Sequence, residues 1–256
     1  MLKHSNHPYP RSILYTRFKM YPKTIKNILF QPKNSEVYLK KFSADLSQFL
    51  NVDQGLIKPC AMARVGIYLI IKQFIKNNKK EIILSPYTIS DVVNMVLCAG
   101  GVPVFCDTEP ATCNIDVPKI ENLINKNTAA IMVTHFYGLA CDIKLAKSIC
   151  NKNQIPLIED AAQAFGVKVD GKYVGTFGDA GIFSFGLYKN VTSFIGGAVV
   201  TKDKKLAKLI DIESESFNTY NLFDIMPKII KGGITDLITH PILFKRIFYK
   251  VIKWAS

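Results

Sequence analysis

Short apolar runs and helical patterns alternate regularly along the chain from residue 81 onward. The apolar runs have the length and continuity of buried strands, and the segments between them repeat apolar residues at helical spacing. The expected strands cover residues 81–86, 102–107, 128–135, 155–160, 181–185 and 196–201, and the expected helices cover 88–100, 116–126 and 143–152. This alternation predicts an α/β domain around a mainly parallel sheet. Within residues 167–174, the pair Asp170-Gly171 predicts a tight hairpin turn.

Polar and ionisable side chains follow the apolar strands at the points where the strands end. Ser85, Asp107, His135, Asp160 and Ser184 all stand at such positions. Parallel strands end at one edge of a sheet, and ligands of α/β domains bind outside that edge. The sequence therefore predicts a site at this edge, without yet indicating its chemistry.

Charge narrows the choice of partners only in part. The chain has 33 Lys and Arg against 20 Asp and Glu, a net charge of +13, and 15 of the basic residues lie in residues 1–80 beside only three acidic ones. No DNA- or RNA-binding motif accompanies them, so no nucleic-acid partner is expected. A phosphorylated substrate and an anionic membrane surface suit the sign of the charge equally well.

The remaining composition is that of an ordinary globular protein. At 48% hydrophobic and 21% charged residues, the chain is neither disordered nor fibrous. No apolar stretch reaches the roughly 18 to 20 residues that span a bilayer, and the first residues lack a secretory signal, so a cytoplasmic location is expected. The six cysteines form no Cys-x-x-Cys pair, and His4, His7 and His240 lack ligand spacing. Buried free thiols are expected, and a metal site is not.

Two strand-end residues and one lysine suggest a specific chemistry. Asp160 closes an apolar strand, Ser184 closes another, and Lys189 lies five residues beyond Ser184. A carboxylate and a lysine that meet in one pocket suit pyridoxal 5'-phosphate, because the aspartate can hold the pyridine nitrogen protonated while the lysine binds the aldehyde. Taken alone, however, Lys189 is better interpreted as a solvated surface lysine, because lysines are numerous in this chain. Glu159 is adjacent to Asp160 in a strand, so the two side chains should point to opposite faces.

A longer set of motifs resembles a known family. Cys60-Ala61-Met62-Ala63 at a helix start is followed by SPYT, AGGVPVFCD, NID, HFYG, IEDAAQA, GDAGIFSF, K-N and GGAVVT, over roughly 150 residues from Pro59 to Lys208. In order and spacing these motifs are similar to those of the DegT/StrS-type (DegT/DnrJ/EryC) sugar aminotransferases, which depend on pyridoxal phosphate. The resemblance implies fold type I of the aspartate aminotransferase superfamily, a three-layer α/β/α large domain with a mainly parallel mixed sheet.

The resemblance also implies roles for individual residues. Lys189 matches the lysine that binds the cofactor and moves the proton, and Asp160 matches the partner of the pyridine nitrogen. Gln163 matches a residue beside the phenolic oxygen, and Ser184 matches a hydroxyl on the phosphate. Ala61 and Met62 match the pair at a helix start whose backbone amides bind phosphate, and Ile89 matches the residue that stacks on the ring.

The sequence departs from the family at several of these positions. Met62 replaces a residue with a hydroxyl, and Ile89 replaces an aromatic residue, although Tyr87 is near. Lys189 argues against the dehydratase relatives, which have histidine there. The family has an aromatic-Asn-aromatic-Arg segment whose asparagine reaches the phosphate of the neighbouring subunit. This segment is missing here, and Tyr220-Asn221 resembles it only weakly.

Length is the larger departure, because relatives continue into a small C-terminal domain. The expected organisation is an N-terminal basic arm with helices of the large domain in residues 1–58, a cofactor-binding core in 59–215, and a divergent or truncated C-terminal amphipathic region in 216–256. Within that region, residues 243–253 alternate apolar and basic residues at helical spacing. Such a helix either contacts a membrane surface or a partner, or packs on the rest of the protein.

These observations together favour one function. We expect an aminotransferase that moves an amino group, from glutamate as the donor usual in the family, to a keto group of a nucleotide-linked sugar in polysaccharide or amino-sugar biosynthesis. The resemblance further implies a homodimer. The alternative is a truncated, catalytically impaired member that binds a cofactor or a partner.

Overall fold

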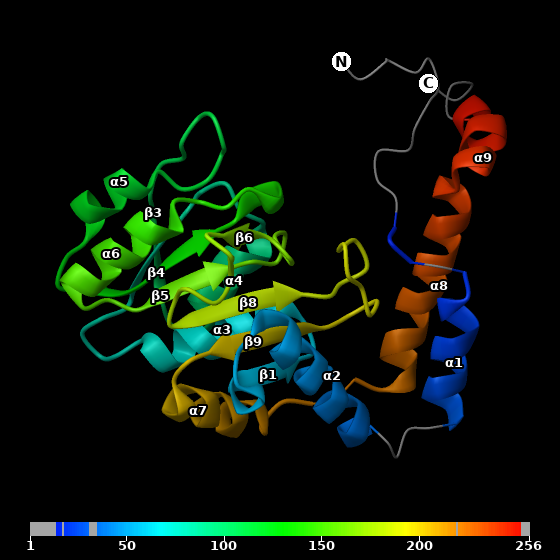
Figure 1. Ribbon diagram of the computed structural model, residues 1–256, viewed down its shortest axis with the longest axis horizontal. Coiled ribbons are helices and arrows are strands. Elements are labelled where there is room, and N and C mark those ends of the chain that lie inside the picture. Colours follow the sequence, from blue (N-terminus) through cyan, green and yellow to red (C-terminus); the bar gives the residue numbers. More distant parts are fainter. Residues whose placement is uncertain (1–13, 17, 31–34, 219, 252–256) are drawn as a thin grey trace.

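A seven-stranded mixed sheet forms the centre of the structure, a computed structural model that describes residues 14–16, 18–30, 35–218 and 220–251 (Figure 1). The strand order is β1-β9-β8-β5-β4-β2-β3, and β9 is antiparallel to both its neighbours, whereas the other pairs are parallel. The strands are β1 (Ile57–Cys60), β2 (Glu81–Leu84), β3 (Val102–Phe105), β4 (Thr128–Thr134), β5 (Leu157–Asp160), β8 (Ala180–Ser184) and β9 (Gly197–Thr201). The mainly parallel sheet predicted from the sequence is therefore confirmed.

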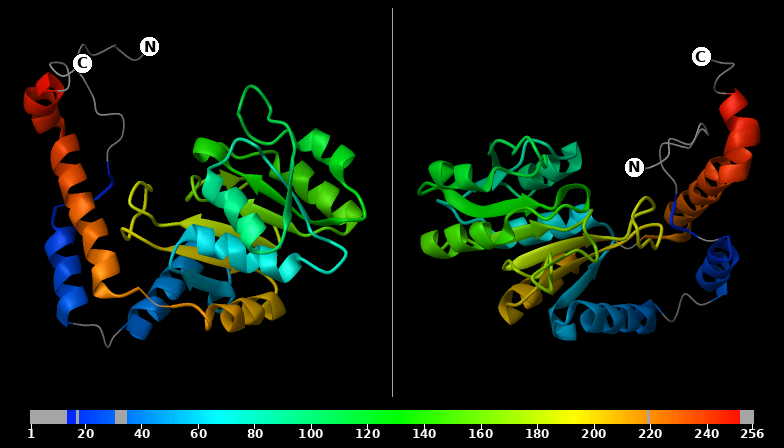
Figure 2. Two further views of the ribbon diagram at one scale, coloured as in Figure 1. Left: turned by 180° about the vertical axis from the view of Figure 1, so that it is seen from behind. Right: turned by 45° about the horizontal axis from the view of Figure 1, so that its top comes forward.

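Helices cover both faces of this sheet and give three layers (Figures 1 and 2). One face carries α3 (Ala63–Phe74), α4 (Ser90–Cys98) and α7 (Lys204–Ser214), and the other carries α2 (Ser35–Leu50), α5 (Val117–Ile120) and α6 (Ile143–Asn153). Successive strand residues serve opposite layers, as Ile82 and Leu84 pack with α3 and α4, whereas Ile83 packs with α6. Burying each such aliphatic side chain contributes about 1.5–3 kcal/mol relative to its exposure.

The expected helix over 116–126 is wrong in its extent. It contains only α5 and a 3-10 turn, Glu121–Leu123. The helical path ends at Leu123, and just beyond it the Asn125 side chain donates to the Leu123 carbonyl at 3.3 Å and accepts the backbone amide of Asn127 at 2.8 Å. The backbone amide of Asn125 donates to the Thr128 hydroxyl at 3.0 Å. Asparagine that bonds to nearby backbone in this way competes with helix formation.

The expected hairpin is present as β6 (Lys168–Val169) and β7 (Lys172–Tyr173). Asp170 and Gly171 have φ values of 48° and 77°. Both residues thus occupy the left-handed region that a two-residue turn of this kind requires, and Gly adopts it without steric cost.

Two helices from opposite ends of the chain lie side by side at one end of the sheet (Figure 1). They are α1 (Met20–Phe30) and α8 (Leu222–Thr239). The hydroxyl of Tyr21 donates to Asp236 at 2.6 Å, and the rings and side chains of Tyr21, Phe194 and Ile229 form a small buried cluster. Phe194 belongs to the loop between β8 and β9, so this cluster joins the helix pair to the sheet domain.

Beyond α8 the described chain continues through α9 (Pro241–Leu243) and a π-helical turn, Phe244–Phe248. Phe244 is buried, but Ile247 and Val251 are half exposed. Residues 252 and 253 of the predicted amphipathic segment, like residues 1–13 of the predicted basic arm, lie outside the described residues. Among the described helices, none combines the length and the apolar character that crossing a membrane requires.

Candidate active site

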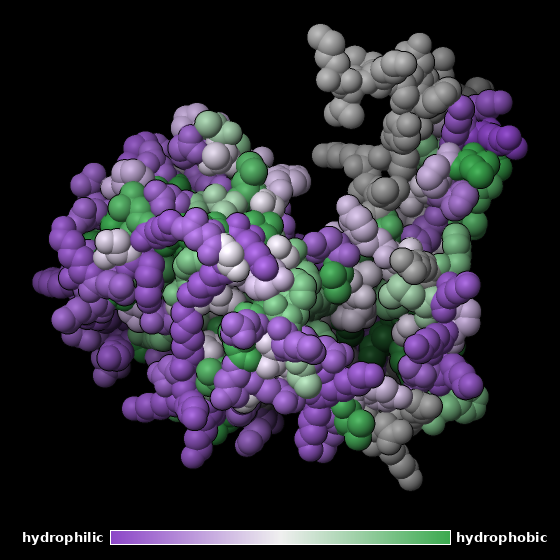
Figure 3. All heavy atoms as spheres, viewed as in Figure 1, coloured by the Kyte–Doolittle hydropathy of each residue, from purple (hydrophilic) through white to green (hydrophobic). Residues whose placement is uncertain are grey.

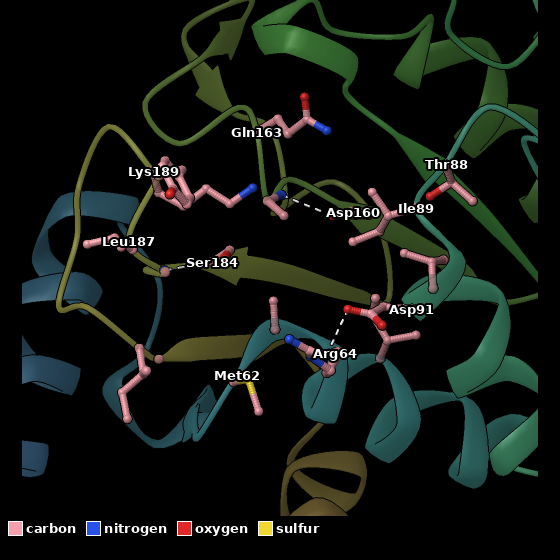
Figure 4. Close-up of a pocket in the computed structure, with 18 of the residues that line it drawn as sticks. Met62, Arg64, Thr88, Ile89, Asp91, Asp160, Gln163, Ser184, Leu187 and Lys189 are labelled. Atoms are coloured by element: carbon pink, nitrogen blue, oxygen red, sulfur yellow. Dashed lines mark hydrogen bonds and ion pairs between the residues drawn. The ribbon is translucent and has the colours of Figure 1, made fainter. Parts of the chain in front are cut away.

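A cavity of about 690 Å³ opens at the edge of the sheet where the parallel strands end. The ends of β4, β5 and β8 form its floor, the starts of α3 and α4 form one wall, and the loop between β8 and β9 forms another. Residues of α8 complete the lining. The volume lies within the range of about 300–1,000 Å³ that is usual for small-molecule sites. Figure 4 shows the arrangement of the lining side chains.

Asp160 and Lys189 meet in this cavity. Asp160 ends β5 with only 5% of its surface exposed, and its carboxylate accepts the amide of Ala162 at 3.0 Å. Lys189 lies on the loop after β8, and Figure 4 shows its side chain extending toward Asp160. The lysine that could have been an ordinary surface residue is thus directed inward by its loop.

Burial shifts the pKa of each of these two groups toward its neutral form. It raises the pKa of the Asp160 carboxyl, against the opposing effects of the Ala162 amide, Lys189 and His135. It lowers the pKa of the Lys189 amine, and the nearby Asp160 opposes this shift. An amine with a lowered pKa is more readily available as a nucleophile at neutral pH.

Glu159 and His135 lie behind the floor of the cavity and not in it. The Glu159 carboxylate is fully buried on the opposite face of β5, where it accepts the amides of Gly175 at 2.8 Å and Gly178 at 2.6 Å. His135 accepts the amide of Cys141 at Nδ1 and therefore donates from Nε2 to Glu159, 3.1 Å away. As the alternation of side chains along a strand predicts, the adjacent carboxylates of Glu159 and Asp160 do not share a pocket.

The start of α3 and the end of β8 form the side of the cavity where a phosphate is expected. Met62 is the N-cap of α3 with extended backbone and makes no side-chain hydrogen bond, and Ser184 lines the cavity close by. Ala61, expected beside Met62, is exposed and does not line the cavity. The helix begins at Ala63, so Met62 and the first-turn residues Ala63 and Arg64 form the wall instead.

The residues expected near the cofactor ring are also at the cavity. Ile89 is the N-cap of α4, lines the cavity and is 64% exposed. Tyr87 lines it too and contacts the ring of Phe136, with centroids 4.7 Å apart. The side-chain oxygen of Gln163 accepts the amide of Tyr137 at 3.2 Å. In this structure the amide group of Gln163 is therefore engaged with the neighbouring loop.

Sequence reasoning missed several charged residues of the lining. Arg64 and Asp91 form an ion pair at 2.7 Å between the first turns of α3 and α4. Lys228 and Lys231 reach the cavity from α8. One signal for α8 was available in the sequence, because Asn221 and Asp224 form a capping box at its start.

Solved structures of aminotransferases share this fold. PseC of Helicobacter pylori, an aminotransferase involved in the biosynthesis of pseudoaminic acid, matches with a TM-score of 0.71 at 27% identity, over 86% of this chain and 58% of that one. NtdA from Bacillus subtilis, with bound cofactor PMP, matches with a TM-score of 0.68 at 25% identity, over 91% and 58%. The fold is that of the fold type I aminotransferases.

The family follows from the sequence comparisons. The sequence model of the DegT/DnrJ/EryC1/StrS aminotransferase family matches residues 33–217, and the chain belongs to this family. GDP-perosamine synthase of Vibrio cholerae is 35% identical over 164 residues, which cover 64% of this chain and 44% of that protein. The chain spans about half the length of the curated relatives it matches.

The residues of the cavity fit pyridoxal phosphate. A buried carboxylate, an inward-directed amine, a helix start and a strand-end hydroxyl are the groups that the pyridine nitrogen, the aldehyde and the phosphate require. The departures at Met62 and Ile89 remain in the structure, since neither side chain can donate a hydrogen bond or stack as an aromatic ring. Backbone amides at the start of α3 do not depend on the Met62 side chain.

Proposed function

We propose that this protein uses pyridoxal phosphate to transfer an amino group from glutamate to a keto group of a nucleotide-linked sugar. The observation that carries the proposal is the convergence of the buried Asp160 and of Lys189 in one cavity at the edge of the sheet. Membership of a sugar aminotransferase family supports it, as does the cofactor named for NtdA. The GDP-perosamine synthases among the relatives support a nucleotide-linked sugar as substrate, and the relative named spore coat polysaccharide biosynthesis protein SpsC supports a role in polysaccharide biosynthesis.

Each residue has a defined task in this proposal. When bound, pyridoxal phosphate supplies an aldehyde that reacts with amines and a ring that withdraws electrons from them. The Nζ atom of Lys189 would hold the aldehyde of the cofactor and, once released from it, would accept and return a proton. The carboxylate of Asp160 keeps a proton on the ring nitrogen. The start of α3, at Met62, and the hydroxyl of Ser184 bind the phosphate.

Gln163, Ile89 and Ala61 have weaker parts in this proposal. Gln163 would approach the phenolic oxygen only after releasing Tyr137, and Ile89 would cover one face of the ring without aromatic stacking. Ala61 would contribute only through its backbone, because its side chain lies outside the cavity.

We further propose a homodimer in the cytoplasm, with a membrane contact at the C-terminal end of the described chain. The described cysteines are free thiols, which supports a reducing compartment.

The side chains at the C-terminal end of the described chain support the membrane contact. Ile242, Ile247 and Val251 are half exposed, and exposed Arg246 and Lys250 lie among them. Apolar and basic side chains exposed together suit an anionic lipid surface.

The release of 2-oxoglutarate from glutamate tests the function without knowledge of the sugar. Purified protein loaded with pyridoxal phosphate is mixed with glutamate, and one 2-oxoglutarate per active site is expected, because no keto sugar is present to complete the cycle. The Lys189→Arg variant should release none. If the wild-type protein binds the cofactor but releases no 2-oxoglutarate, the proposed transfer from glutamate is wrong.

A further inference from the structure

Helix α8 contributes to the cavity although it lies outside the part of the chain that matches the family. The match ends at residue 217, and α8 covers Leu222–Thr239. Lys228 and Lys231 of α8 nevertheless line the same cavity as Asp160 and Lys189. Their role therefore cannot be carried over from the family and has to be derived from the structure.

Contacts on both sides fix α8 against the cavity. A Cβ placed on Gly232 would lie 3.1 Å from Leu187 and 3.3 Å from Phe194, so the helix packs directly on the loop that carries Lys189. On the α1 side, Asp236 accepts the hydroxyl of Tyr21 at 2.6 Å. The two lysines thus project from a helix that is held in place along its packed face and near its end.

The charges of the lining do not balance without a ligand. Among the described lining residues, Arg64, Lys189, Lys228 and Lys231 are basic, whereas Asp91 and Asp160 are acidic, so four positive charges face two negative ones. Arg64 pairs with Asp91, and Lys189 lies near Asp160. The surplus of two positive charges therefore lies on α8.

The spacing of the two lysines suits a ligand with two adjacent anionic groups. Lys228 and Lys231 are three residues apart in a helix, so their side chains leave the same face with Cβ atoms about 5–6 Å apart. The Lys228 ammonium lies 4.3 Å from the centroid of the Tyr220 ring, a cation–π contact that orients it. Tyr220-Asn221 is the pair that partly resembles the family's phosphate-binding segment. In this structure the Asn221 side chain caps α8.

We propose that Lys228 and Lys231 form a subsite for the diphosphate of the substrate. Ammonium groups bind phosphoryl oxygens as strong charge-assisted partners, and two of them match the two phosphoryl groups of a diphosphate. The subsite deepens the proposed function, since it places the nucleotide side of the substrate against α8 and the sugar toward Lys189. Glutamate, the other anionic substrate, carries two carboxylates, and the test below separates the two ligands.

Calorimetric titration with inorganic pyrophosphate tests the subsite. The protein is first loaded with pyridoxal phosphate, reduced with borohydride and freed of excess cofactor, so that the cofactor's own phosphate position is filled. Wild-type protein should bind pyrophosphate, and the double variant Lys228→Gln/Lys231→Gln should bind at least tenfold more weakly. The double variant with arginine at both positions should stay within about threefold of wild type, because charge is kept.

A matched control comes from α1, where Lys23 and Lys26 are exposed, are likewise three residues apart, and do not line the cavity. Lys23→Gln/Lys26→Gln should bind pyrophosphate as wild type does. Absence of pyrophosphate binding by wild type, equal weakening in both glutamine pairs, or glutarate binding as tight as that of pyrophosphate would each overturn the subsite.

The proposed function can fail separately from this subsite. Peptide mapping of the reduced protein reports whether Lys189 carries the pyridoxyl group, and it does not depend on α8. If Lys189 is unlabelled while pyrophosphate binding still depends on the α8 lysines, the subsite stands and the proposed chemistry fails.

Discussion

The substitution Asp160→Asn should slow the reaction with glutamate without unfolding the protein. Asparagine has nearly the same shape, and its carbonyl oxygen can still accept the Ala162 amide that now donates to Asp160 at 3.0 Å. What is lost is the negative charge that holds a proton on the ring nitrogen of the cofactor. The fold should therefore survive, and the chemical step should be slower.

The size of the effect follows from the burial of Asp160, which is 5% exposed and beyond effective screening by water. A hydrogen bond to a charged group contributes about 1.5–3 kcal/mol. Since about 1.36 kcal/mol corresponds to a factor of ten in rate, the loss should lie between about tenfold and 150-fold. The loss concerns the chemical step, so rapid mixing with saturating glutamate should show it in the first-order rate of 2-oxoglutarate release.

The matched control is Asp107→Asn. Asp107 follows another strand of the sheet, but its side chain is 72% exposed, pairs with Lys119 and lies outside the cavity. This variant should react at the wild-type rate. If Asp160→Asn also reacts within threefold of wild type, with circular dichroism and cofactor binding unchanged, the assigned role of Asp160 is wrong.

Three further predictions concern the surroundings of the site. Glu159→Gln should lower the free energy of unfolding by about 2–4 kcal/mol in urea titrations, because a buried carboxylate with three partners loses its charge. As a control, Glu121→Gln, at an exposed residue, should change the free energy of unfolding by less than about 1 kcal/mol. Equal losses in the two variants would contradict the assigned role of Glu159. Acetic anhydride should label Lys189 of the cofactor-free protein at a lower pH than surface lysines, since burial lowers the pKa of its amine and the neutral amine is the reactive form. Asp160→Asn should move the pH profile of this labelling lower still, because the carboxylate that opposes the shift is removed. A wild-type profile that coincides with that of surface lysines would count against the burial of the amine. A chain without residues 241–256 should remain dimeric in sedimentation but no longer cosediment with anionic vesicles, whereas undiminished cosedimentation would refute the proposed membrane contact.

The sheet and its site edge could be predicted because their signals are local. Strands such as 81–84 and 157–160 contain consecutive apolar residues, Ile82–Leu84 and Leu157–Ile158, as burial on both faces requires, and a polar residue, Ser85 or Asp160, stands just after or at the end of each. Asp160 and Ser184 could therefore be placed at one edge from the sequence alone. Lys189 could not, because a loop residue has no periodicity, and only the family motifs indicated its role.

The helix pair α1 and α8 could not be predicted in this way. These helices are about 200 residues apart in the chain, and no local pattern indicates that Tyr21 meets Asp236 or that Gly232 packs on Phe194. For the same reason Lys228 and Lys231 could not be predicted as lining residues. Lysines are also frequent in this chain, so the residue type alone does not indicate a site. That Ala61 lies outside the cavity while Ala63 and Arg64 line it could not be predicted either, because the helix start depends on backbone geometry that the motif alone does not define.

The central claim is that Lys189 binds pyridoxal phosphate in the cavity beside Asp160. The most direct measurement is borohydride reduction of the loaded protein, followed by proteolysis and mass spectrometry of the peptides. The account predicts one pyridoxyl group per chain, attached to the peptide that contains Lys189. Label on another lysine, or spread over many lysines with Lys189 unmodified, would contradict it.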